Sequence, residues 1–394
     1  MPRRLADATG GGRAAKRPRQ RRKHLYLVTE DWEQGYSIRK VDLEEDYDAN
    51  IHTLDKEQAG NSPRKHSDRR LPPAVFRLEA PHQGADHFTA AFGTKIMALH
   101  HTPRRYVPVF DVRTRCLSFG PRMRRDPSTP IYVPVADRLY GLDFDTFEML
   151  HPPPPLVDPN CGMDVPKWRS WRRLPPPPFK RERVDSTRVT SHAVHPDGRT
   201  IFVSIDGKTG ATFSFDTMAS SPRWTRSGSW KLPFKGPAHY DCDLDAWVGL
   251  ARDPDMLGRL CSCDVPSTDD DDGCRQLPAW KLSKEKLFCQ DPDEKHIGAA
   301  LVCLGTGCRS KFCVVQCLSL DDREEGMYKE YLPERERYLL RLTTFSLAYD
   351  KNGDLRTAAR RRVRSFELPK SVAENSAFLV DPVAFWISYM RYES

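Results

Sequence analysis

Residues 189–205 read VTSHAVHPDGRTIFVSI, in which two runs rich in β-branched and aromatic residues flank His195-Pro196-Asp197-Gly198. Proline presets φ at the second position of a turn, and aspartate and glycine tolerate the conformations that follow it. Runs of this composition on both sides of a turn are typical of a β-hairpin. The stretch therefore predicts antiparallel β-structure.

This hairpin continues into a larger unit. A third run, ATFSFD at residues 211–216, ends on Asp216, whose carboxylate can accept backbone N–H groups in an Asx-type turn. A fourth segment begins at Trp224 and continues to Leu232-Pro233 and Phe234. We therefore expect residues 189–234 to form one four-stranded sheet.

Parts of the unit recur along the chain. Strands that close on an aspartate are expected at Asp42, Asp111, Asp143, Asp216 and Asp264. Repeated four-stranded units fit a β-propeller better than a sandwich, so the expected fold is all-β. We predict about six four-stranded blades, with seven as the alternative, near residues 24–82, 88–121, 130–179, 187–234, 237–288 and 296–369. Residues 24–394 contain neither the Gly-Gly doublet of kelch repeats nor the Trp-Asp signature of WD40 repeats.

The net charge of +8 is concentrated at the N-terminus. Residues 1–23 are rich in Lys and Arg with Asp7 as their only acid, so the rest of the chain is neutral. We expect residues 1–23 to be a disordered basic leader. Its densest part is a nuclear-import type of cluster, formed by Lys16, Arg17, Arg19, Arg21, Arg22 and Lys23. One alternative is a solvated tail without a targeting signal, and the other is an arm that binds nucleic acid through counterion release.

Residues 24–394 are expected to form a single propeller domain with a long polar loop at 44–73. No apolar run reaches the roughly 18 residues that a membrane span needs, so we expect a soluble monomer without a membrane partner. The stretch 376–387 is too apolar for a free tail. We expect one half of it to pack onto the first blade near Leu25–Val28 and close the ring; a short terminal helix is the alternative.

Residues that suggest chemistry have structural explanations. The 11 cysteines are odd in number, and Cys303, Cys308, Cys313 and Cys317 lack the short paired gaps of a zinc knuckle, which favours buried thiols in a reducing compartment. His192, His195 and Asp197 form a small polar group that the turn already explains. We therefore predict no catalytic residue, no cofactor and no metal site.

Several motifs resemble a plant family that is expanded in grasses and carries a domain of unknown function. The family is similar in style to kelch and F-box-associated β-propellers. The motifs are Leu25–Val28, Gly35–Lys40, Phe92–Met97, Ala193–Arg199, Ala246–Gly249, Leu340–Phe345 and Tyr349–Gly353. The resemblance covers roughly residues 23–386, and it implies a plant origin and no known activity.

The sequence thus predicts a non-enzymatic protein-interaction scaffold in the nucleus, or in both nucleus and cytoplasm. Its partners are expected to bind loops on the propeller faces, because a rigid frame positions such loops. One alternative is a nucleic-acid-associated factor that uses the basic leader. A second is a propeller enzyme or sugar-binding protein with a site in the central channel, since a fold alone does not exclude activity.

Overall fold

The computed structural model describes residues 22–32, 35–43, 69–79, 87–99, 106–125, 127, 129–155, 167–179, 189–206, 210–268, 276–288, 291–292, 294–305, 310–320, 337–357, 361–368 and 382–389. Regular structure in these ranges is β-strand, apart from one 3-10 turn at Pro254–Met256. The described ranges contain no helix with the length and hydropathy required to cross a membrane. The prediction of an all-β chain is confirmed.

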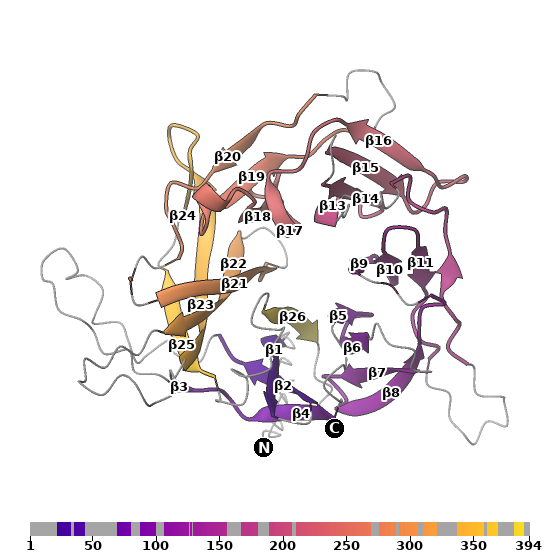
Figure 1. The fold of residues 1–394 in the computed structure, drawn as a ribbon, viewed down its shortest axis with the longest axis horizontal. Coiled ribbons are helices and arrows are strands. Elements are labelled where there is room, and N and C mark those ends of the chain that lie inside the picture. The colour runs from indigo at the N-terminus through magenta and orange to yellow at the C-terminus, as the bar shows by residue number, and fades with distance from the viewer. Residues whose placement is uncertain are drawn as a thin grey trace, which may run out of the picture.

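Sheets of mainly antiparallel strands follow one another around a ring, in chain order except for β3 and β26 (Figure 1). The first contains β26 (Val383–Tyr389), β1 (Arg22–Trp32), β2 (Gly35–Val41) and β4 (Ala74–Glu79). The second contains β5 (His87–Ala91), β6 (Lys95–Leu99), β7 (Tyr106–Asp111) and β8 (Cys116–Pro121). The third contains β9 (Ile131–Val135), β10 (Arg138–Leu142), β11 (Phe147–Leu150) and β12 (Arg172–Arg173).

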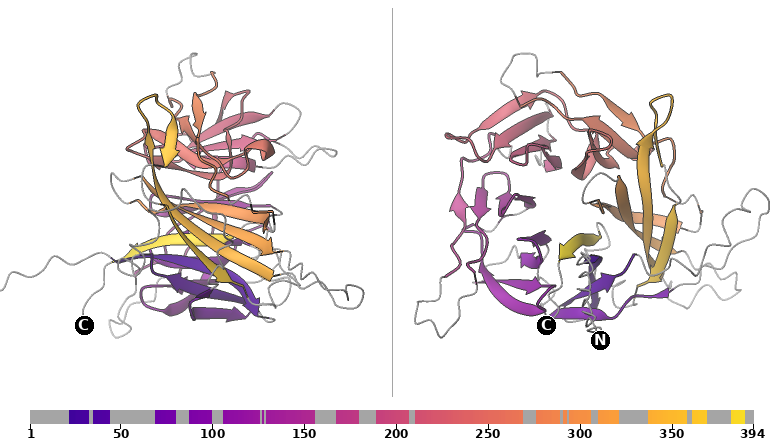
Figure 2. Two further views of the ribbon diagram at one scale, coloured as in Figure 1. Left: turned by 90° about the vertical axis from the view of Figure 1, so that its left-hand side faces the viewer. Right: turned by 180° about the vertical axis from the view of Figure 1, so that it is seen from behind.

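An eight-stranded sheet comes next. It joins β13 (Val189–Val194), β14 (Thr200–Ile205), β15 (Ala211–Asp216) and β16 (Trp224–Gly228) to β17 (Phe234–Asp241), β18 (Ala246–Ala251), β19 (Leu260–Asp264) and β20 (Trp280–Leu282). The last sheet contains β21 (Glu294–Cys303), β22 (Lys311–Leu320), β23 (Arg337–Tyr349), β24 (Leu355–Thr357), β25 (Arg362–Glu367) and β3 (Arg69–Arg70). The fold is propeller-like and not a sandwich, because the sheets stand around a common axis in both face views (Figures 1 and 2).

The four strands predicted between residues 189 and 234 are present, but they form half of the eight-stranded sheet, and Phe234 begins β17 instead of ending the unit. β13 and β14 form the hairpin around His195–Gly198, with Ala193 paired to Phe202. β14 pairs in turn with β15, and β15 with β16. Gly198 has a φ of +71° and its N–H donates to the carbonyl of His195 at 2.9 Å. The local turn chemistry was therefore sufficient to locate this hairpin.

One predicted member of the aspartate pattern occupies a different place. Asp111, Asp216 and Asp264 each end the third strand of their four-stranded unit. Asp143 instead follows β10, which is the second strand of its sheet. The strand expected to close on Asp143 is β10, which ends one residue earlier, at Leu142. Asp143 follows a second strand instead of a third because a short turn at residues 144–146 leads from it directly into β11.

The ring is closed by strands from the two ends of the described chain. β26 pairs antiparallel with β1 from Val383 opposite Val28 to Tyr389 opposite Arg22. Ile387 is buried, and Phe385 and Trp386 are partly buried against hydrophobic clusters that include β1. The predicted packing of a C-terminal segment on Leu25–Val28 is confirmed, and the alternative of a terminal helix is wrong for residues 383–389.

A second unusual junction joins the halves of the eight-stranded sheet. β13 and β17 run parallel, with Ser191, His192 and Ala193 opposite Gly236, Pro237 and Ala238. β17 can reach β13 because it bulges away from β18 between Lys235 and His239, where Gly236 has a φ of +72°. A left-handed φ strongly favours glycine. This junction, the β13–β17 seam, links two sheet units by backbone hydrogen bonds.

Hydrophobic clusters fill the spaces between neighbouring sheets. Phe76 of β4 stacks on Phe110 of β7 with ring centroids 4.4 Å apart, and Phe147 of β11 meets Phe215 of β15 edge-on at 4.8 Å. Another cluster joins β1 and β2 to the last sheet, where Cys313, Val315 and Cys317 alternate along one face of β22. Each sheet is therefore held mainly by its two neighbours in the ring.

Candidate interaction surface

The predicted import cluster is divided by the start of the first strand. Lys16, Arg17, Arg19 and Arg21 lie outside the described residues. Arg22 and Lys23 are the first two residues of β1 and pair with Tyr389 and Ser388. β1 therefore begins two residues inside the predicted leader. Within the predicted polar loop at 44–73, residues 44–68 are outside the described ranges and Arg69–Arg70 form β3.

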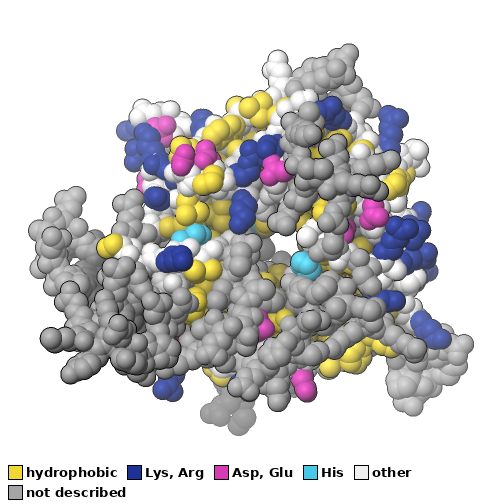
Figure 3. All heavy atoms as spheres, viewed as in Figure 1, with side chains coloured by type: hydrophobic (Ala, Val, Ile, Leu, Met, Phe, Trp, Pro, Cys, Tyr) yellow, Lys and Arg dark blue, Asp and Glu magenta, His cyan; other side chains and the backbone are white. Residues whose placement is uncertain are grey.

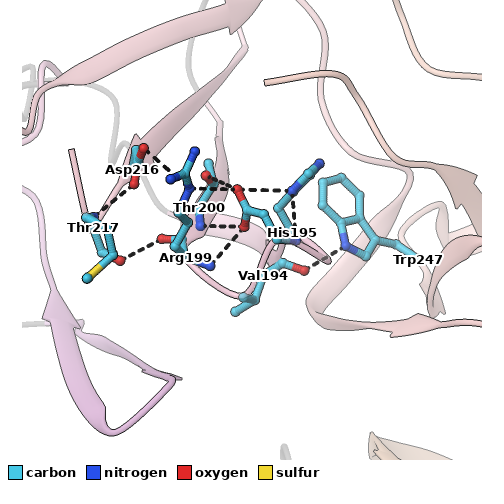
Figure 4. A network of polar contacts seen from close by, with 9 residues as sticks. Val194, His195, Arg199, Thr200, Asp216, Thr217 and Trp247 are labelled. Carbon is cyan, nitrogen blue, oxygen red and sulfur yellow. Dashed lines mark hydrogen bonds and ion pairs between the residues drawn. The ribbon is translucent and has the colours of Figure 1, made fainter. Parts of the chain in front are cut away.

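The polar group at the central hairpin stabilises a turn (Figure 4). The Asp197 carboxylate accepts bonds from the backbone N–H groups of Arg199 and Thr200 and from the Thr200 hydroxyl, at 2.6–2.9 Å. Nδ1 of His195 lies 3.2 Å from the same carboxylate. Burial opposes ionisation, but these hydrogen bonds outweigh it and lower the pKa of Asp197. Asp197 is thus committed to the turn, as Asp216 is through the Met218 N–H at 2.8 Å.

His192 does not join His195 and Asp197. It lies on β13 beside the seam, where burial and the nearby His239 lower its pKa to about 4. Burial also lowers the pKa of His239, whose Nε2 lies 3.0 Å from the carbonyl oxygen of Leu301 on β21. Both imidazoles are neutral at pH 7 and belong to the packing between sheets.

The cysteines that suggested zinc are mostly buried thiols. Cys261, Cys263, Cys313 and Cys317 are buried and free, and Cys303 is half-buried. Burial raises the pKa of Cys313 and Cys317 to about 12, which leaves them protonated at neutral pH. Cys274 and Cys308 are outside the described residues. In the part of the chain that is described, no group of three or more His, Cys, Asp or Glu side chains could hold a metal ion.

The outer hairpin of the second sheet carries the largest exposed apolar side chains that lie together. Tyr106, Leu117 and Phe119 are 63%, 45% and 60% exposed. Tyr106 pairs with Pro121, Pro108 with Phe119 and Phe110 with Leu117, so all these side chains are on one face. The remaining large exposed hydrophobic side chains in the described ranges are distributed over other elements. We call the set Tyr106, Leu117 and Phe119 the β8 rim.

The β8 rim continues a buried surface outward. Phe110, on the same face of the hairpin, is buried against Phe76 of the first sheet. Further out, the same face meets solvent, and hydrophobic side chains are visible along the lower right margin of Figure 3, where Figure 1 places β7 and β8. Scattered apolar residues are normal on protein surfaces, whereas a contiguous exposed group indicates a contact site.

Sequence reasoning did not identify the β8 rim. Alternating apolar residues on a strand indicate that one face is covered, but they do not say how far outward the cover extends. The available signal was the run of arginines around β8, at Arg113, Arg115, Arg122, Arg124 and Arg125.

A protein-family model described as "Protein of unknown function (DUF1668)" matches residues 22–365. None of the curated proteins is significantly similar to this chain in sequence. Among solved structures, apo AztD from Citrobacter koseri is similar with a TM-score of 0.42 and 10% identity, over 94% of this chain and 99% of that one. A protein from Lactobacillus plantarum has a TM-score of 0.39 and 8% identity, over 94% and 100% of the two chains.

Proposed function

The chain belongs to the DUF1668 family, whose function is unknown, and we propose that it is a non-enzymatic protein-interaction scaffold that binds partners through the β8 rim. The observation that carries this proposal is the exposure of Tyr106, Leu117 and Phe119 on one face of an outer hairpin. Aromatic side chains are enriched among residues that dominate binding energies. Because these side chains are 45–63% exposed, burying the remainder of each under a partner would contribute roughly 1–2 kcal/mol.

We propose that the frame behind the rim is a six-bladed propeller. The two halves of the eight-stranded sheet, β13–β16 and β17–β20, each run antiparallel in chain order like the four-stranded sheets. Counting each half as a blade gives six, with β26 completing the first. Such a frame holds the β7–β8 hairpin fixed, so little conformational entropy is lost there on binding.

Affinity capture with matched surface variants tests the scaffold. The triple variant Tyr106→Ser, Leu117→Ser, Phe119→Ser removes the rim. The control Met218→Ser, Leu257→Ser changes two exposed apolar residues elsewhere. We expect both variants to unfold at the same urea concentration as the wild type, and the triple variant alone to lose captured proteins. Identical captured sets from all three proteins would refute the rim as the docking surface.

We also propose a nuclear or nucleocytoplasmic location, supported by the basic cluster before β1. Because Arg22 and Lys23 are part of β1, an import signal would depend mainly on Lys16, Arg17, Arg19 and Arg21. Replacing these four by alanine should move a fluorescent fusion out of the nucleus, whereas replacing Arg3, Arg4 and Arg13 should not. An unchanged distribution contradicts the import role. Oligonucleotide binding that is lost with residues 1–21 would favour the nucleic-acid alternative.

A further inference from the structure

We propose that β8 accepts a partner segment as an additional strand, and that this segment is extended, acidic and apolar at alternate positions. The proposal rests on the β8 rim being the docking surface. Three features support it: β8 is the edge of its sheet, its anchor residues alternate, and its surroundings are basic.

β8 is paired on one side only among the described strands. It bonds to β7 from Tyr106 opposite Pro121 to Asp111 opposite Cys116, and it stands last in its sheet. Residues 116–119 are all exposed. An edge strand presents a row of backbone N–H and C=O groups that another extended chain can pair with.

The molecule already adds a strand to an outer edge elsewhere. β3 lies between β2 and β4 in the sequence, yet it pairs parallel with β25 in the last sheet, with Arg69 opposite Phe366 and Arg70 opposite Glu367. An outer edge in this ring is therefore accessible to a segment that comes from another sheet. No described strand pairs with the outer edge of β8. At the end of that edge the Trp171 indole N–H donates to the Pro121 carbonyl at 2.9 Å, so the added strand is proposed to pair with Cys116–Phe119.

The side chains of β8 define the pattern that a partner must have. Leu117 and Phe119 are on one face, beside the rim residue Tyr106 of β7. Cys116 and Ser118 are on the other face and are small. A strand added to β8 would place every second side chain beside Leu117 and Phe119. Those positions in the partner should therefore be apolar.

The surroundings of β8 are strongly basic. Arg113 and Arg115 precede the strand, Arg122, Arg124 and Arg125 follow it, and all five are exposed. The acids between residues 106 and 126 are Asp111, whose carboxylate is 2.7 Å from the Lys95 ammonium, and Asp126, which follows Arg125. Asp145, from the neighbouring sheet, lies 3.2 Å from Arg125. Complementary charge increases association rates and selects partners, so acidic residues are expected at the remaining partner positions.

Arginines beside aromatic rings also suit single-stranded nucleic acid. The structure favours a peptide because Leu117 offers no stacking surface and because the free strand edge provides backbone groups that a nucleic acid cannot pair with in register. An oligonucleotide is therefore included as a competing probe.

The test uses fluorescence polarisation with the full chain and a labelled synthetic peptide, Glu-Leu-Asp-Val-Glu-Leu-Asp-Phe-Glu. We expect saturable binding that weakens at least tenfold in Phe119→Ser, in the double variant Arg115→Glu, Arg124→Glu, and when lysines replace the acidic residues of the peptide. The Met218→Ser control should bind like the wild type. No binding at 100 µM peptide, or equal binding of the lysine peptide, overturns the proposal.

Two N-methylated peptides test the strand addition itself. N–H groups of alternate residues point to the same edge of an extended chain. One peptide carries methyl groups on the backbone nitrogens of its odd-numbered residues, and the other carries them on its even-numbered residues. Only the peptide whose methyl groups face β8 should lose binding. Equal behaviour of the two peptides overturns strand addition, as does tighter binding of a thymidine 20-mer that depends on the same residues. If the peptide experiments fail but the triple serine variant still loses captured proteins, strand addition is refuted while the β8 rim is retained as the docking surface.

Discussion

The indole N–H of Trp247 donates a 2.9 Å hydrogen bond to the backbone carbonyl of Val194, and this bond joins β18 to β13 across the β13–β17 seam. Trp247 is fully buried and meets the ring of Phe202 edge-on at 5.3 Å. The two halves of the eight-stranded sheet are thus connected by a side chain as well as by parallel backbone pairing.

Trp247→Phe should separate the contribution of the hydrogen bond to stability from that of the ring packing. Phenylalanine retains a ring beside Phe202 but cannot donate to the carbonyl of the half-buried Val194, and the loss of this hydrogen bond should cost about 0.5–1.5 kcal/mol. Trp247→Ala should lose about 3–5 kcal/mol, because it also leaves a cavity. Urea unfolding measures both. A Phe variant as stable as the wild type would mean that packing alone holds the tryptophan.

Substitution of Gly236 and substitution of Gly249 should destabilise the protein for different reasons. Gly236 has a φ of +72° and open space where a Cβ would project, so an alanine there costs about 1–2 kcal/mol of backbone strain. A Cβ on Gly249 would lie 2.6 Å from the Cβ of Phe234, which predicts a loss of about 1–3 kcal/mol from overpacking. Asparagine should be tolerated better than alanine at 236 but worse at 249. The same ranking at both positions, measured by thermal unfolding, would contradict this account.

Asp111 should make stability depend on pH in the acid range. Burial opposes its ionisation, but hydrogen bonds from Lys95 and Thr94 and from the Arg113 N–H hold its pKa below the usual 3.8. A lowered pKa in the folded state stabilises the protein above the unfolded pKa, and this contribution is lost as the pH falls through the folded pKa. Asp111→Asn should therefore cost about 1–3 kcal/mol at pH 7 and progressively less below pH 3.8.

Urea titrations of wild type and Asp111→Asn from pH 7 to pH 2.5 provide the measurement. The matched control is Asp145→Asn, since Asp145 is 71% exposed and its ion pair with Arg125 is at the surface. The control should show little difference from the wild type at any pH. A difference for Asp111→Asn that is constant across the range would exclude its carboxylate as the cause.

Removing β26 should weaken β1 specifically. Without residues 382–394, one edge of β1 loses every backbone partner from Arg22 to Val28. We expect a lower melting temperature and faster amide exchange in residues 22–32 than in β14. Ile387→Ala keeps the strand and should cost about 2–5 kcal/mol, because Ile387 is buried. The control Val363→Ala changes a residue that is 54% exposed. Unchanged exchange in β1 after the truncation would contradict a role of β26 in closing the ring.

The sequence was sufficient where the controlling interactions are local. The hairpin at His195–Gly198 follows from proline, aspartate and glycine within four residues, and Asp216 binds the Met218 N–H as its position predicts. The packing of residues 383–389 on β1 was also predictable, because a strongly apolar terminal stretch needs cover and an unclosed ring provides an edge.

The sequence was insufficient where distant backbones meet. Parallel pairing of β13 with β17 depends on a bulge at Gly236, and pairing of β3 with β25 brings Arg69 beside Phe366. Neither pattern is visible in the periodicity of one segment. The β8 rim was missed for a related reason. Phe110 and Phe119 have the same chemistry and are on the same face, and only the position of the neighbouring sheet makes one buried and the other exposed.

The pairing of β26 with β1 also sets an order of events during synthesis. β1 leaves the ribosome before all the other described strands, and β26 leaves after them. The edge of β1 from Arg22 to Val28 therefore lacks its partner strand while the rest of the ring is translated. The ring can close only after β26 has left the ribosome. A nascent chain stalled before residue 383 exposes that edge to other polypeptides, which makes it the expected binding site for a chaperone during biogenesis.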